Sequence, residues 1–350
     1  MTSPASRPIA ITLGDPCGIG PEVVLKAFAQ GLPCPALVVG DPGLLAREAS
    51  RLRLPLAVRT LASPSALAQD GAHPGAPAPG AMQVPVLATT ALPVDLPAGR
   101  VDARAGDAAY RYIARAATLA MRSEVRAVVT APISKEAMHL AGHDYPGHTE
   151  LLADLAGGVP VRMMLVNAEL RTVLVTIHLA LRDALAALSR ETILQTIEIA
   201  DGALRAAGIA APRIAVAGVN PHAGEAGMFG REEIDIVAPA VAEARARGID
   251  ASGPYPPDTV FMRARGFRHF DVVVAMYHDQ GLIPVKYMGI DDGVNVTIGL
   301  PFVRTSPDHG TAFDIAGRSG PDGLGLADER SLLAAVRLAD ELSKPASTRG

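Results

Sequence analysis

Cysteine is scarce in this chain of 350 residues, which contains only Cys17 and Cys34. Two thiols at this spacing form neither a zinc knuckle nor a CxxC redox motif. The sequence also lacks an uninterrupted apolar run of about 18 residues, the length that a membrane-spanning helix requires. Its first segment, MTSPASRPIAITLGDP, lacks the charged and long apolar regions of a signal peptide. We therefore expect a reduced, cytoplasmic protein with no membrane association.

An excess of positive charge is also missing. The 32 Lys and Arg residues are outnumbered by 36 Asp and Glu residues, giving a formal net charge of −4. Such a chain presents no basic field for nucleic acid or for an acidic membrane surface. With 49% hydrophobic and 19% charged residues, the composition is that of a globular protein, and the length allows about two domains. Single Lys and Arg residues are expected to act locally, on a small anion.

Short apolar runs alternate with Ala- and Leu-rich helical stretches along most of the chain. Strands are predicted at residues 9–13, 36–40, 125–132, 161–166, 172–178, 213–219, 270–278 and 294–300. Helices are predicted at residues 22–30, 107–122, 189–207 and 232–247. Because most of these strands are apolar throughout, they are typical of a parallel sheet covered on both faces. The sequence thus predicts an α/β fold with a largely parallel sheet.

Three histidines follow apolar strands in the same way. TVLVTIH ends at His178, RIAVAGVNPH at His222 and FDVVVAMYH at His278. Ligand sites of open α/β sheets lie at the carboxyl ends of the strands, so three imidazoles at one edge could bind a divalent cation such as zinc, cobalt or nickel. Each histidine alone could equally be a loop residue making one hydrogen bond. Their separations match no local metal motif, so the fold or a partner subunit would have to bring them together.

Two further segments carry polar residues suited to a small anion. In the C-terminal part, Lys286, Asn295 and Arg304 each adjoin an apolar run. Lysine supplies a point charge and arginine a planar fork for phosphate oxygens, although both could also be solvated surface cations. Asn295 lies between valines and needs a partner, which a substrate could supply. In GHTELL, Thr149 after His148 is predicted to cap a helix, or to contact a ligand.

The turn GDPCGIGPE, residues 14–22, lies where a phosphate-binding turn would be found, after the first strand and before a helix. Its glycines do not form G-x-G-x-x-G, and no Lys-Ser/Thr pair follows to make a P-loop. A tight strand-to-helix turn with Pro21 near the first helical residue explains this segment at least as well.

Taken in order, several strings resemble the PdxA family of 4-hydroxythreonine-4-phosphate dehydrogenases of vitamin B6 biosynthesis. They are GDPCGIGPE, VTAPISK, YPGHTELLA, TIHLALRD, GVNPHAGE, YPPDTVF, MYHDQGLIPVKY and GVNVTIGLPFVRTSPDHGTAFDIAG, and the resemblance extends from about Ile9 to Leu338. It implies two α/β/α lobes similar to those of the isocitrate and isopropylmalate dehydrogenases, with an active-site cleft between them. We expect one lobe at residues 1–130 plus 305–350. The second lobe, at residues 131–304, is expected to carry the metal ligands and the dimer interface.

The resemblance also implies a set of site residues. The three family positions for metal ligands fall on His178, His222 and His278, in a site shared across a homodimer and holding zinc, magnesium or cobalt. The implied substrate contacts are His148, Thr149, Lys286, Asn295 and Arg304. The string HGTAFDIAG is similar to the nucleotide-contacting loop of isopropylmalate dehydrogenases, which implies that His309, Gly310, Thr311 and Asp314 bind NAD or NADP. Lys286 is also a candidate catalytic residue, with Asp258 or Asp279 as the proton relay.

The implied activity is metal-dependent, NAD(P)-linked oxidation of 4-phosphooxy-L-threonine. The product, 2-amino-3-oxo-4-phosphooxybutanoate, is a β-keto acid that loses CO₂ to give 3-amino-2-oxopropyl phosphate. Related branches oxidise D-threonate or D-erythronate 4-phosphate, or aromatic cis-dihydrodiols, and these stay as alternatives. Outside the dehydrogenases, three histidines would also suit a metal-dependent hydrolase or aldolase, and the scaffold would suit a sensor of a phosphorylated ligand. Neither of these needs the HGTAFDIAG string, which favours the dehydrogenase.

Overall fold

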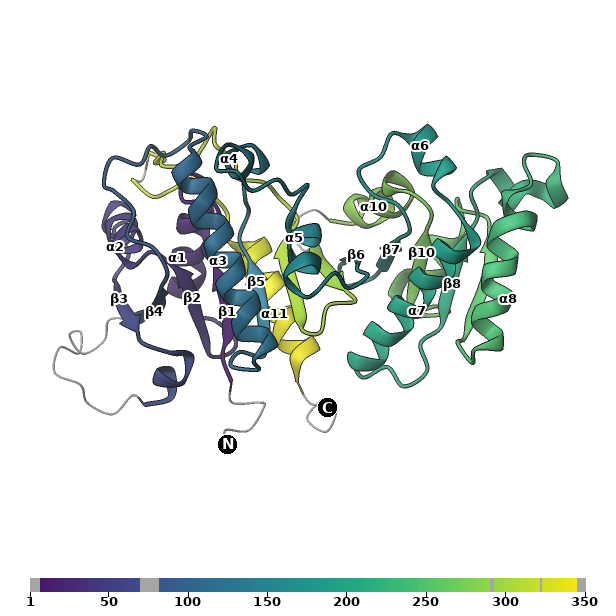
Figure 1. Ribbon diagram of the computed structural model, residues 1–350, viewed down its shortest axis with the longest axis horizontal. Coiled ribbons are helices and arrows are strands. Elements are labelled where there is room, and N and C mark those ends of the chain that lie inside the picture. The colour runs from purple at the N-terminus through teal and green to yellow at the C-terminus, as the bar shows by residue number, and fades with distance from the viewer. Residues whose placement is uncertain (1–6, 70–81, 290–292, 322, 345–350) are drawn as a thin grey trace. The chain divides into compact units, whose positions relative to one another are not determined.

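The computed structural model describes residues 7–69, 82–289, 293–321 and 323–344, and these form two compact units. Unit 1 comprises the described residues of Met1–Val159 and Leu300–Gly350, and unit 2 comprises those of Pro160–Gly299. Both units consist of strands flanked by helices (Figure 1). None of the described helices is both long and apolar enough to cross a membrane.

The sheet of unit 1 is parallel in all its described pairings. Its strands run in the order β3-β4-β2-β1-β5-β12. Their bounds are β1 Ile9–Thr12, β2 Ala36–Gly40, β3 Leu56–Leu61, β4 Met82–Ala88, β5 Ala127–Thr130 and β12 Val303–Pro307. The last strand comes from the C-terminal part of the chain and pairs with β5, so Arg304 lies opposite Val128.

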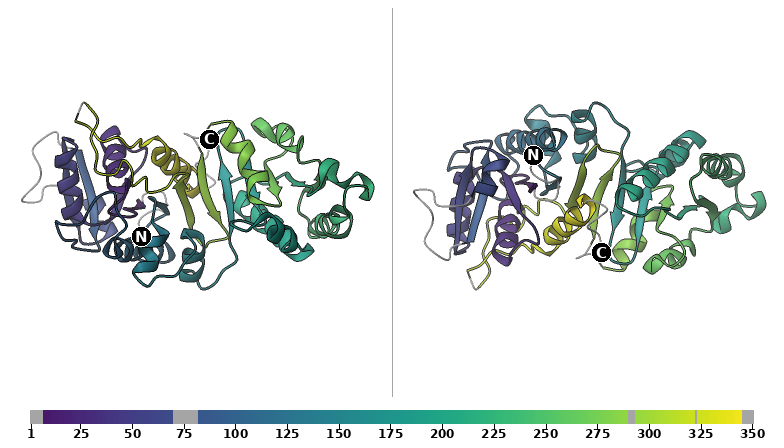
Figure 2. Two further views of the ribbon diagram at one scale, coloured as in Figure 1. Left: turned by 90° about the horizontal axis from the view of Figure 1, so that it is seen from above. Right: turned by 90° about the horizontal axis from the view of Figure 1, so that it is seen from below.

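Helices cover both faces of the unit 1 strands (Figure 2). Helix α3 (Ala103–Met121) packs on β1, β2 and β5, whereas α11 (Arg330–Ser343) packs on β12 and β5. The other helical segments are α1 Gly20–Gln30, α2 Pro42–Arg51, α4 Lys135–Leu140, α5 His148–Leu155 and the 3₁₀ turn η2 Pro64–Gln69. Local sequence explains the helix starts, because Asp41 caps α2 and Ser134 caps α4 through side-chain hydrogen bonds to backbone N–H groups.

Unit 2 has a mixed sheet in the order β11-β6-β7-β10-β8-β9. Strands β7, β10, β8 and β9 are parallel, and β6 is antiparallel to both of its neighbours. The strands are β6 Arg162–Val166, β7 Arg171–Leu174, β8 Ile214–Ala217, β9 Ala251–Tyr255, β10 Val272–Ala275 and β11 Val294–Ile298. The helical segments are α6 Leu181–Ala186, α7 Arg190–Ala206, η3 Pro221–Gly227, η4 Glu233–Val237, α8 Ala238–Ala246, α9 Val260–Ala264, η5 Arg265–Phe267 and α10 His278–Tyr287.

The α/β class and the largely parallel pairing are confirmed, and each of the eight predicted strands is present within its predicted range or within one residue of it. Four strands, β3, β4, β9 and β12, were not predicted. The residues of β12, VRTSP, include charged and hydroxyl side chains and give no apolar run, although Arg304, Thr305 and Ser306 are all buried. β9 contains Gly253 and Pro254, which are depleted in strands, and it lies at the sheet edge.

The unit boundaries differ from the expected lobes. Residues 131–159 and 300–304 were expected in the second lobe but belong to unit 1. The physical reason is a hydrophobic cluster in which Ile113 of α3 packs with Met138 of α4 and with Leu151 and Leu152 of α5. Because α4 and α5 complete the cover over this face of unit 1, the chain leaves the unit only after α5.

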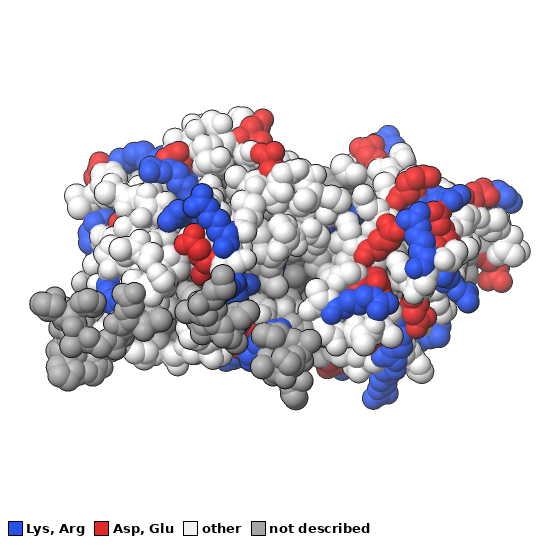
Figure 3. All heavy atoms as spheres, turned by 60° about the horizontal axis from the view of Figure 1, so that its bottom comes forward, with Lys and Arg blue, Asp and Glu red and all other residues white. Residues whose placement is uncertain are grey.

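Charged residues of both signs are interspersed on the described surface. On the face drawn in Figure 3, Lys and Arg side chains alternate with Asp and Glu side chains. Many are paired: Arg247, for example, contacts Glu243 and Glu198, and Arg231 lies 2.9 Å from Asp235. This surface agrees with the small net charge of the sequence.

Candidate active site

The three candidate histidines follow neighbouring parallel strands of unit 2. His178 comes after β7, His278 after β10 and His222 after β8, and β10 lies between the other two strands. Parallel strands end at the same edge of a sheet, so all three segments leave the sheet on one side. Their placement therefore matches the geometry expected for a ligand site in an α/β sheet.

Backbone contacts beyond the strand ends bring two of the histidines together. The Thr176 hydroxyl donates to the Met276 carbonyl over 2.8 Å, so the segments after β7 and β10 remain side by side. The rings of His178 and His278 then lie 5.9 Å apart between centroids, at an interplanar angle of 40°. His278 is also fixed by its neighbour, because its Nδ1 lies 2.7 Å from Asp279 Oδ1.

Both histidines line a hollow in unit 2. Its volume is about 300 Å³, and its lining residues are Thr176, Ile177, His178, Leu179, Leu181, Ala184, Tyr277, His278 and Asp279. Apart from the two imidazoles and the Asp279 carboxylate, most of this lining is apolar. Convergent polar groups in an otherwise apolar hollow are typical of a small-molecule site.

The backbone at two of the histidines is strained. His178 has a φ of 49° and His222 a φ of 53°. In η3, His222 begins a run of six residues with positive φ that ends at Gly227, and four of the six carry side chains: His222, Ala223, Glu225 and Ala226. Left-handed backbone costs roughly 1–2 kcal/mol for each residue with a side chain. Strain of this kind gathers at functional sites, where surrounding contacts maintain it.

The structure does not assemble a metal site from three side chains of one chain. Within the described residues, no group of three His, Cys, Asp or Glu side chains is positioned to hold a metal ion. The His222 ring packs against Phe229, with 6.3 Å between ring centroids. One chain thus brings His178 and His278 together, and the assignment of His222 as the third ligand stays a prediction.

Gln280, which the sequence analysis did not identify, links the segments of His278 and His222. Its side chain is buried; Oε1 accepts from the Met276 N–H over 2.7 Å and Nε2 donates to the Gly218 carbonyl over 2.8 Å. The ends of β10 and β8 are therefore tied to each other. An amide two residues after a candidate ligand is the only sequence signal for this role.

The other candidates of unit 2 lie on α10, on β11 and in the turn before α9. Lys286 is half-buried on α10, the helix that begins at His278, and Asn295 is half-buried on β11. The Asn295 Oδ1 atom is enclosed and has no hydrogen-bond partner, as expected of an amide that awaits a ligand. Asp258 is exposed before α9, and Asp279 is exposed and contacts His278.

In unit 1, Arg304 is enclosed in the sheet. It is 2% exposed, and its Nη2 donates to the Thr130 hydroxyl on the neighbouring strand over 2.6 Å. Burial lowers its pKa to about 9, and the charge of Glu150 opposes this shift. A guanidinium with this pKa stays charged at neutral pH. Because it is buried, its attraction to a bound anion is strong.

His148 is the first residue of α5. The residue is half-buried but its Nε2 atom is fully enclosed and has no hydrogen-bond partner. Burial lowers the pKa of His148 well below its usual value, and the charges of Arg304 and Lys135 add to the effect. The imidazole is therefore neutral at physiological pH. The predicted cap at Thr149 is wrong, because extended Gly147 occupies the N-cap position and Thr149 lies inside the first turn.

The segment expected to contact a nucleotide follows β12. The Thr311 carbonyl accepts the Ile19 N–H over 3.0 Å, and a Cβ at Gly18 would lie only 3.0 Å from Thr311. The GDPCGIGPE turn and this segment therefore form one structure within unit 1, which favours a packing role for the turn. His309 Nδ1 lies 3.1 Å from the Gly310 carbonyl and its Nε2 atom is enclosed, whereas Asp314 is exposed.

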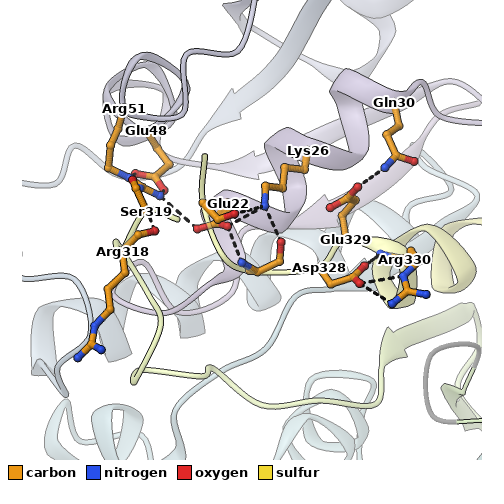
Figure 4. Close-up of polar contacts among 12 residues, drawn as sticks. Glu22, Lys26, Gln30, Glu48, Arg51, Arg318, Ser319, Asp328, Glu329 and Arg330 are labelled. Atoms are coloured by element: carbon orange, nitrogen blue, oxygen red, sulfur yellow. Dashed lines mark hydrogen bonds and ion pairs between the residues drawn. The ribbon is translucent and has the colours of Figure 1, made fainter. Parts of the chain in front are cut away.

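An ion-pair network anchors the chain that comes after this segment (Figure 4). Glu22 on α1 is buried, and its carboxylate contacts Lys26 at 3.0 Å and Arg51 at 3.1 Å. The same carboxylate accepts the Ala327 N–H over 2.7 Å, while Lys26 donates to the Gly325 and Ala327 carbonyls. These contacts fix the C-terminal segment against the first helix.

Asp15 is a buried carboxyl that sequence reasoning missed. It lies in the GDPCGIGPE turn, where its Oδ1 accepts the Cys17 N–H over 2.8 Å and its Oδ2 has no partner. Burial raises its pKa to about 6, and hydrogen bonds from backbone N–H groups oppose the shift. Its position beside a glycine-rich turn is common for turn-forming aspartates, so the sequence did not distinguish it.

Comparison with known proteins gives one consistent result. A model of the family described as pyridoxal phosphate biosynthetic protein PdxA matches residues 33–339. A 4-hydroxythreonine-4-phosphate dehydrogenase of Beijerinckia indica is 52% identical, over 97% of this chain and 96% of the relative. A D-threonate 4-phosphate dehydrogenase of Cupriavidus necator is 48% identical, over 96% of this chain and 97% of the relative. A crystal structure of 4-hydroxythreonine-4-phosphate dehydrogenase from Klebsiella pneumoniae has a TM-score of 0.86 and 46% identity, covering 97% of this chain and all of that one.

Proposed function

We propose that this chain, which belongs to the PdxA family, is an NAD(P)-dependent dehydrogenase of 4-phosphooxy-L-threonine. When bound, the nicotinamide would accept hydride from C3 while the hydroxyl proton is released, which would give 2-amino-3-oxo-4-phosphooxybutanoate. This β-keto acid then loses CO₂ to give 3-amino-2-oxopropyl phosphate. The observation that carries the proposal is the pair of imidazoles, His178 and His278, at the carboxyl edge of a parallel sheet.

The donor set of unit 2 fits a divalent metal. We assign the metal to His178, His222 and His278, and imidazole ligands favour zinc or cobalt over magnesium. Asp279 contacts Nδ1 of His278 and so fixes the ring orientation, and His278 would then hold the metal through Nε2. When bound, the cation would act as a Lewis acid on the substrate oxygen.

The proposal includes a homodimer that shares the metal site between its subunits. Only two of the three assigned ligands approach each other in one chain, so a second copy is needed to complete the set. Large apolar side chains next to the candidate ligands are exposed, as expected of a surface that a second copy covers: Leu179, Leu181, Met228 and Phe229.

The chain's own polar residues would hold the substrate. Arg304 and Lys286 would bind the phosphate, because a buried guanidinium and a lysine supply a fork and a point charge. The neutral imidazole of His148 would form a hydrogen bond with the substrate through its enclosed Nε2 atom. The enclosed Oδ1 atom of Asn295 would accept a hydrogen bond from the substrate. Thr149 would add a hydroxyl from the first turn of α5.

For the cofactor, we assign His309, Gly310, Thr311 and Asp314 to NAD or NADP. Strain supports a special role for this loop, since Ala312 has a φ of 43°. Asp258 or Asp279 would relay the proton to solvent, which both carboxylates reach. A cytoplasmic location suits a chain in which both cysteines are free.

A second candidate substrate is D-threonate 4-phosphate, favoured by the 48% identical relative that is named for it. The same phosphate contacts and the same metal would serve both compounds. They differ in the group on C2, an amine in one and a hydroxyl in the other.

A substrate panel tests the proposal. The metal-loaded protein is incubated with NAD or NADP and with 4-phosphooxy-L-threonine, D-threonate 4-phosphate, D-erythronate 4-phosphate or an aromatic cis-dihydrodiol. We expect reduced nicotinamide and CO₂ with the first compound. Turnover of the second or third compound alone would assign the protein to that branch. Turnover of the diol alone would mean that the substrate carries no phosphate. Hydrolysis or carbon–carbon cleavage without reduced nicotinamide would identify a hydrolase or an aldolase.

A further inference from the structure

We propose that Glu233 is a positioning residue whose buried carboxylate holds the His222 turn and thereby sets the affinity of the protein for its divalent metal. This inference rests on the proposed function, because it needs His222 to be a metal ligand. Glu233 is 2% exposed and opens η4, a π-helical turn. Such turns are rare and occur frequently at functional sites.

The carboxylate binds the backbone just ahead of His222. Its Oε1 atom accepts the N–H groups of Val219 and Asn220, both over 2.7 Å. Its Oε2 atom accepts from the Asn220 side-chain amide over 2.9 Å. Strand β8 ends at Ala217, so these two N–H groups have left the sheet and need other acceptors. One charged group satisfies both, and hydrogen bonds to a charged acceptor are the stronger kind.

Two glycines leave room for this carboxylate. A Cβ at Gly218 would lie 3.0 Å from Glu233 Oε1, and a Cβ at Gly224 would lie 2.6 Å from Oε2. Gly224 lies in the middle of the left-handed run and has a φ of 80°. The turn is therefore built around the carboxylate from both sides.

The strain of the turn explains why an anchor is needed. His222, Ala223, Glu225 and Ala226 all have side chains and positive φ values. Without the contacts of Glu233, these residues would relax toward the right-handed region that L-residues prefer, and the His222 imidazole would move with them. Glu233 acts on His222 through the backbone, and the imidazole itself makes the contact with metal. Partners that orient metal ligands in this way typically contribute about 10- to 100-fold in metal affinity.

Glu232 provides a matched control. Its Oε2 atom also accepts from the Asn220 side-chain amide, over 2.6 Å, but none of its described hydrogen bonds goes to the backbone ahead of His222. Glu232→Gln therefore removes the same charge from the adjacent position and leaves both backbone contacts of Glu233 in place. In Glu233→Gln, by contrast, one carboxylate oxygen becomes an NH₂ donor. Whichever way the amide turns, this NH₂ group faces either the two backbone N–H groups or the Asn220 side-chain amide, all of which are donors, and the charge that strengthens the remaining contacts is lost.

The test measures metal affinity on the full-length protein. Metal-free wild type, Glu233→Gln, Glu232→Gln and His222→Ala are titrated with Co²⁺, whose visible absorption reports coordination, and with Zn²⁺ against a chromophoric chelator. The thermal midpoint of each metal-free protein is measured in parallel. We expect Glu233→Gln to bind about 10- to 100-fold more weakly than wild type, and Glu232→Gln to stay within about threefold. If Glu233→Gln does not fold, Gly224→Ala tests the same contact from the opposite side, with the same expected loss.

The outcomes separate this inference from the function on which it rests. Unchanged metal affinity in Glu233→Gln overturns the positioning role, even if the thermal midpoint of that variant falls. The same holds for Gly224→Ala where it replaces Glu233→Gln. An equal loss in Glu232→Gln also overturns it, because the effect would then come from charge and not from the backbone contacts. Unchanged affinity in His222→Ala removes His222 from the metal site, so that the proposed ligand set itself fails.

Discussion

The imidazole rings of His178 and His278 lie 5.9 Å apart between centroids, although a hundred residues of sequence separate them. Their proximity follows from the parallel pairing of β7 with β10, in which Thr172 lies opposite Val273. The Thr176 hydroxyl extends this alignment beyond the strands by bonding to the Met276 carbonyl. Two donor side chains are thus placed by strand register, before any ligand binds.

Removing one of these rings should remove the metal. His278→Ala is expected to lose bound zinc and dehydrogenase activity together, because two imidazoles cannot hold the ion at physiological concentrations as three can. Metal content by mass spectrometry and the rate of nicotinamide reduction measure the two losses. His139→Ala is the control, since that side chain is 70% exposed and lies in unit 1. Full activity without bound metal in His278→Ala would reject the metal assignment.

Replacing the buried guanidinium should affect substrate binding. Arg304→Ala is expected to raise the KM for a phosphorylated substrate by about 10- to 150-fold, since a lost charge-assisted contact costs roughly 1.5–3 kcal/mol. The control is Thr130→Val, which removes the hydroxyl that Arg304 contacts and keeps the positive charge, so a smaller rise is expected. Steady-state kinetics on the proteins that keep the wild-type thermal midpoint decide the question. No change in KM for any phosphorylated substrate would exclude Arg304 from phosphate binding.

The buried carboxyl of Asp15 should make stability depend on pH. Burial raises its pKa from 3.8 to about 6, so the folded protein binds this proton more tightly than the unfolded chain. The contribution of this group to the free energy of unfolding is fully present below about pH 4. It is lost as the pH rises through about 6, a change of about 3 kcal/mol. Asp15→Asn has no such proton, so its stability relative to wild type should increase between about pH 4.5 and about pH 7.5.

Denaturation with urea at the two pH values measures this difference. Asp95→Asn is the control, because the Asp95 side chain is 74% exposed in the same unit and should leave the pH profile unchanged. A wild-type profile in Asp15→Asn would show that the carboxyl is not titrating in this range.

Replacing each of two helical glycines with alanine should change the stability of the protein, in opposite directions. On α3, a Cβ at Gly106 would overlap the Ala137 carbonyl of α4, so Gly106→Ala should destabilise the protein by about 1–3 kcal/mol. On α7, nothing lies within 4 Å of a Cβ at Gly202, and Gly202→Ala should stabilise by about 0.5–1 kcal/mol through helix propensity. Thermal or chemical denaturation measures both. A stabilised Gly106→Ala would mean that α3 and α4 do not pack as closely as the structure shows.

Apolar periodicity was sufficient to predict the central strands. The run ALVVG gave β2 with the correct bounds, and VRMMLV gave β6 to within one residue. Prediction from apolar runs fails for a strand whose polar residues are buried, because their burial depends on hydrogen bonds that cannot be read from the sequence. β12 is the example: Arg304 is enclosed because Thr130 on the next strand accepts its hydrogen bond.

The site was predictable only in part, for a similar reason. Histidines placed directly after apolar strands indicated the carboxyl edge of the sheet, and the structure places His178, His222 and His278 there. Nothing in the string VNPHAGEAG distinguishes a left-handed run from an ordinary loop, because alanine and glutamate rarely adopt that backbone. The turn depends on contacts from Glu233, which a local pattern cannot reveal.

The division of unit 1 between two stretches of chain has a consequence for biosynthesis. Strand β5 leaves the ribosome long before β12, its neighbour, since the whole of Pro160–Gly299 is translated in between. At about 5–20 residues per second, this interval lasts on the order of ten seconds. During it the nascent chain carries an open strand edge, a site at which unfinished polypeptides associate with one another. Chaperone capture during translation should therefore be concentrated in this window and should cease once residues 303–307 emerge.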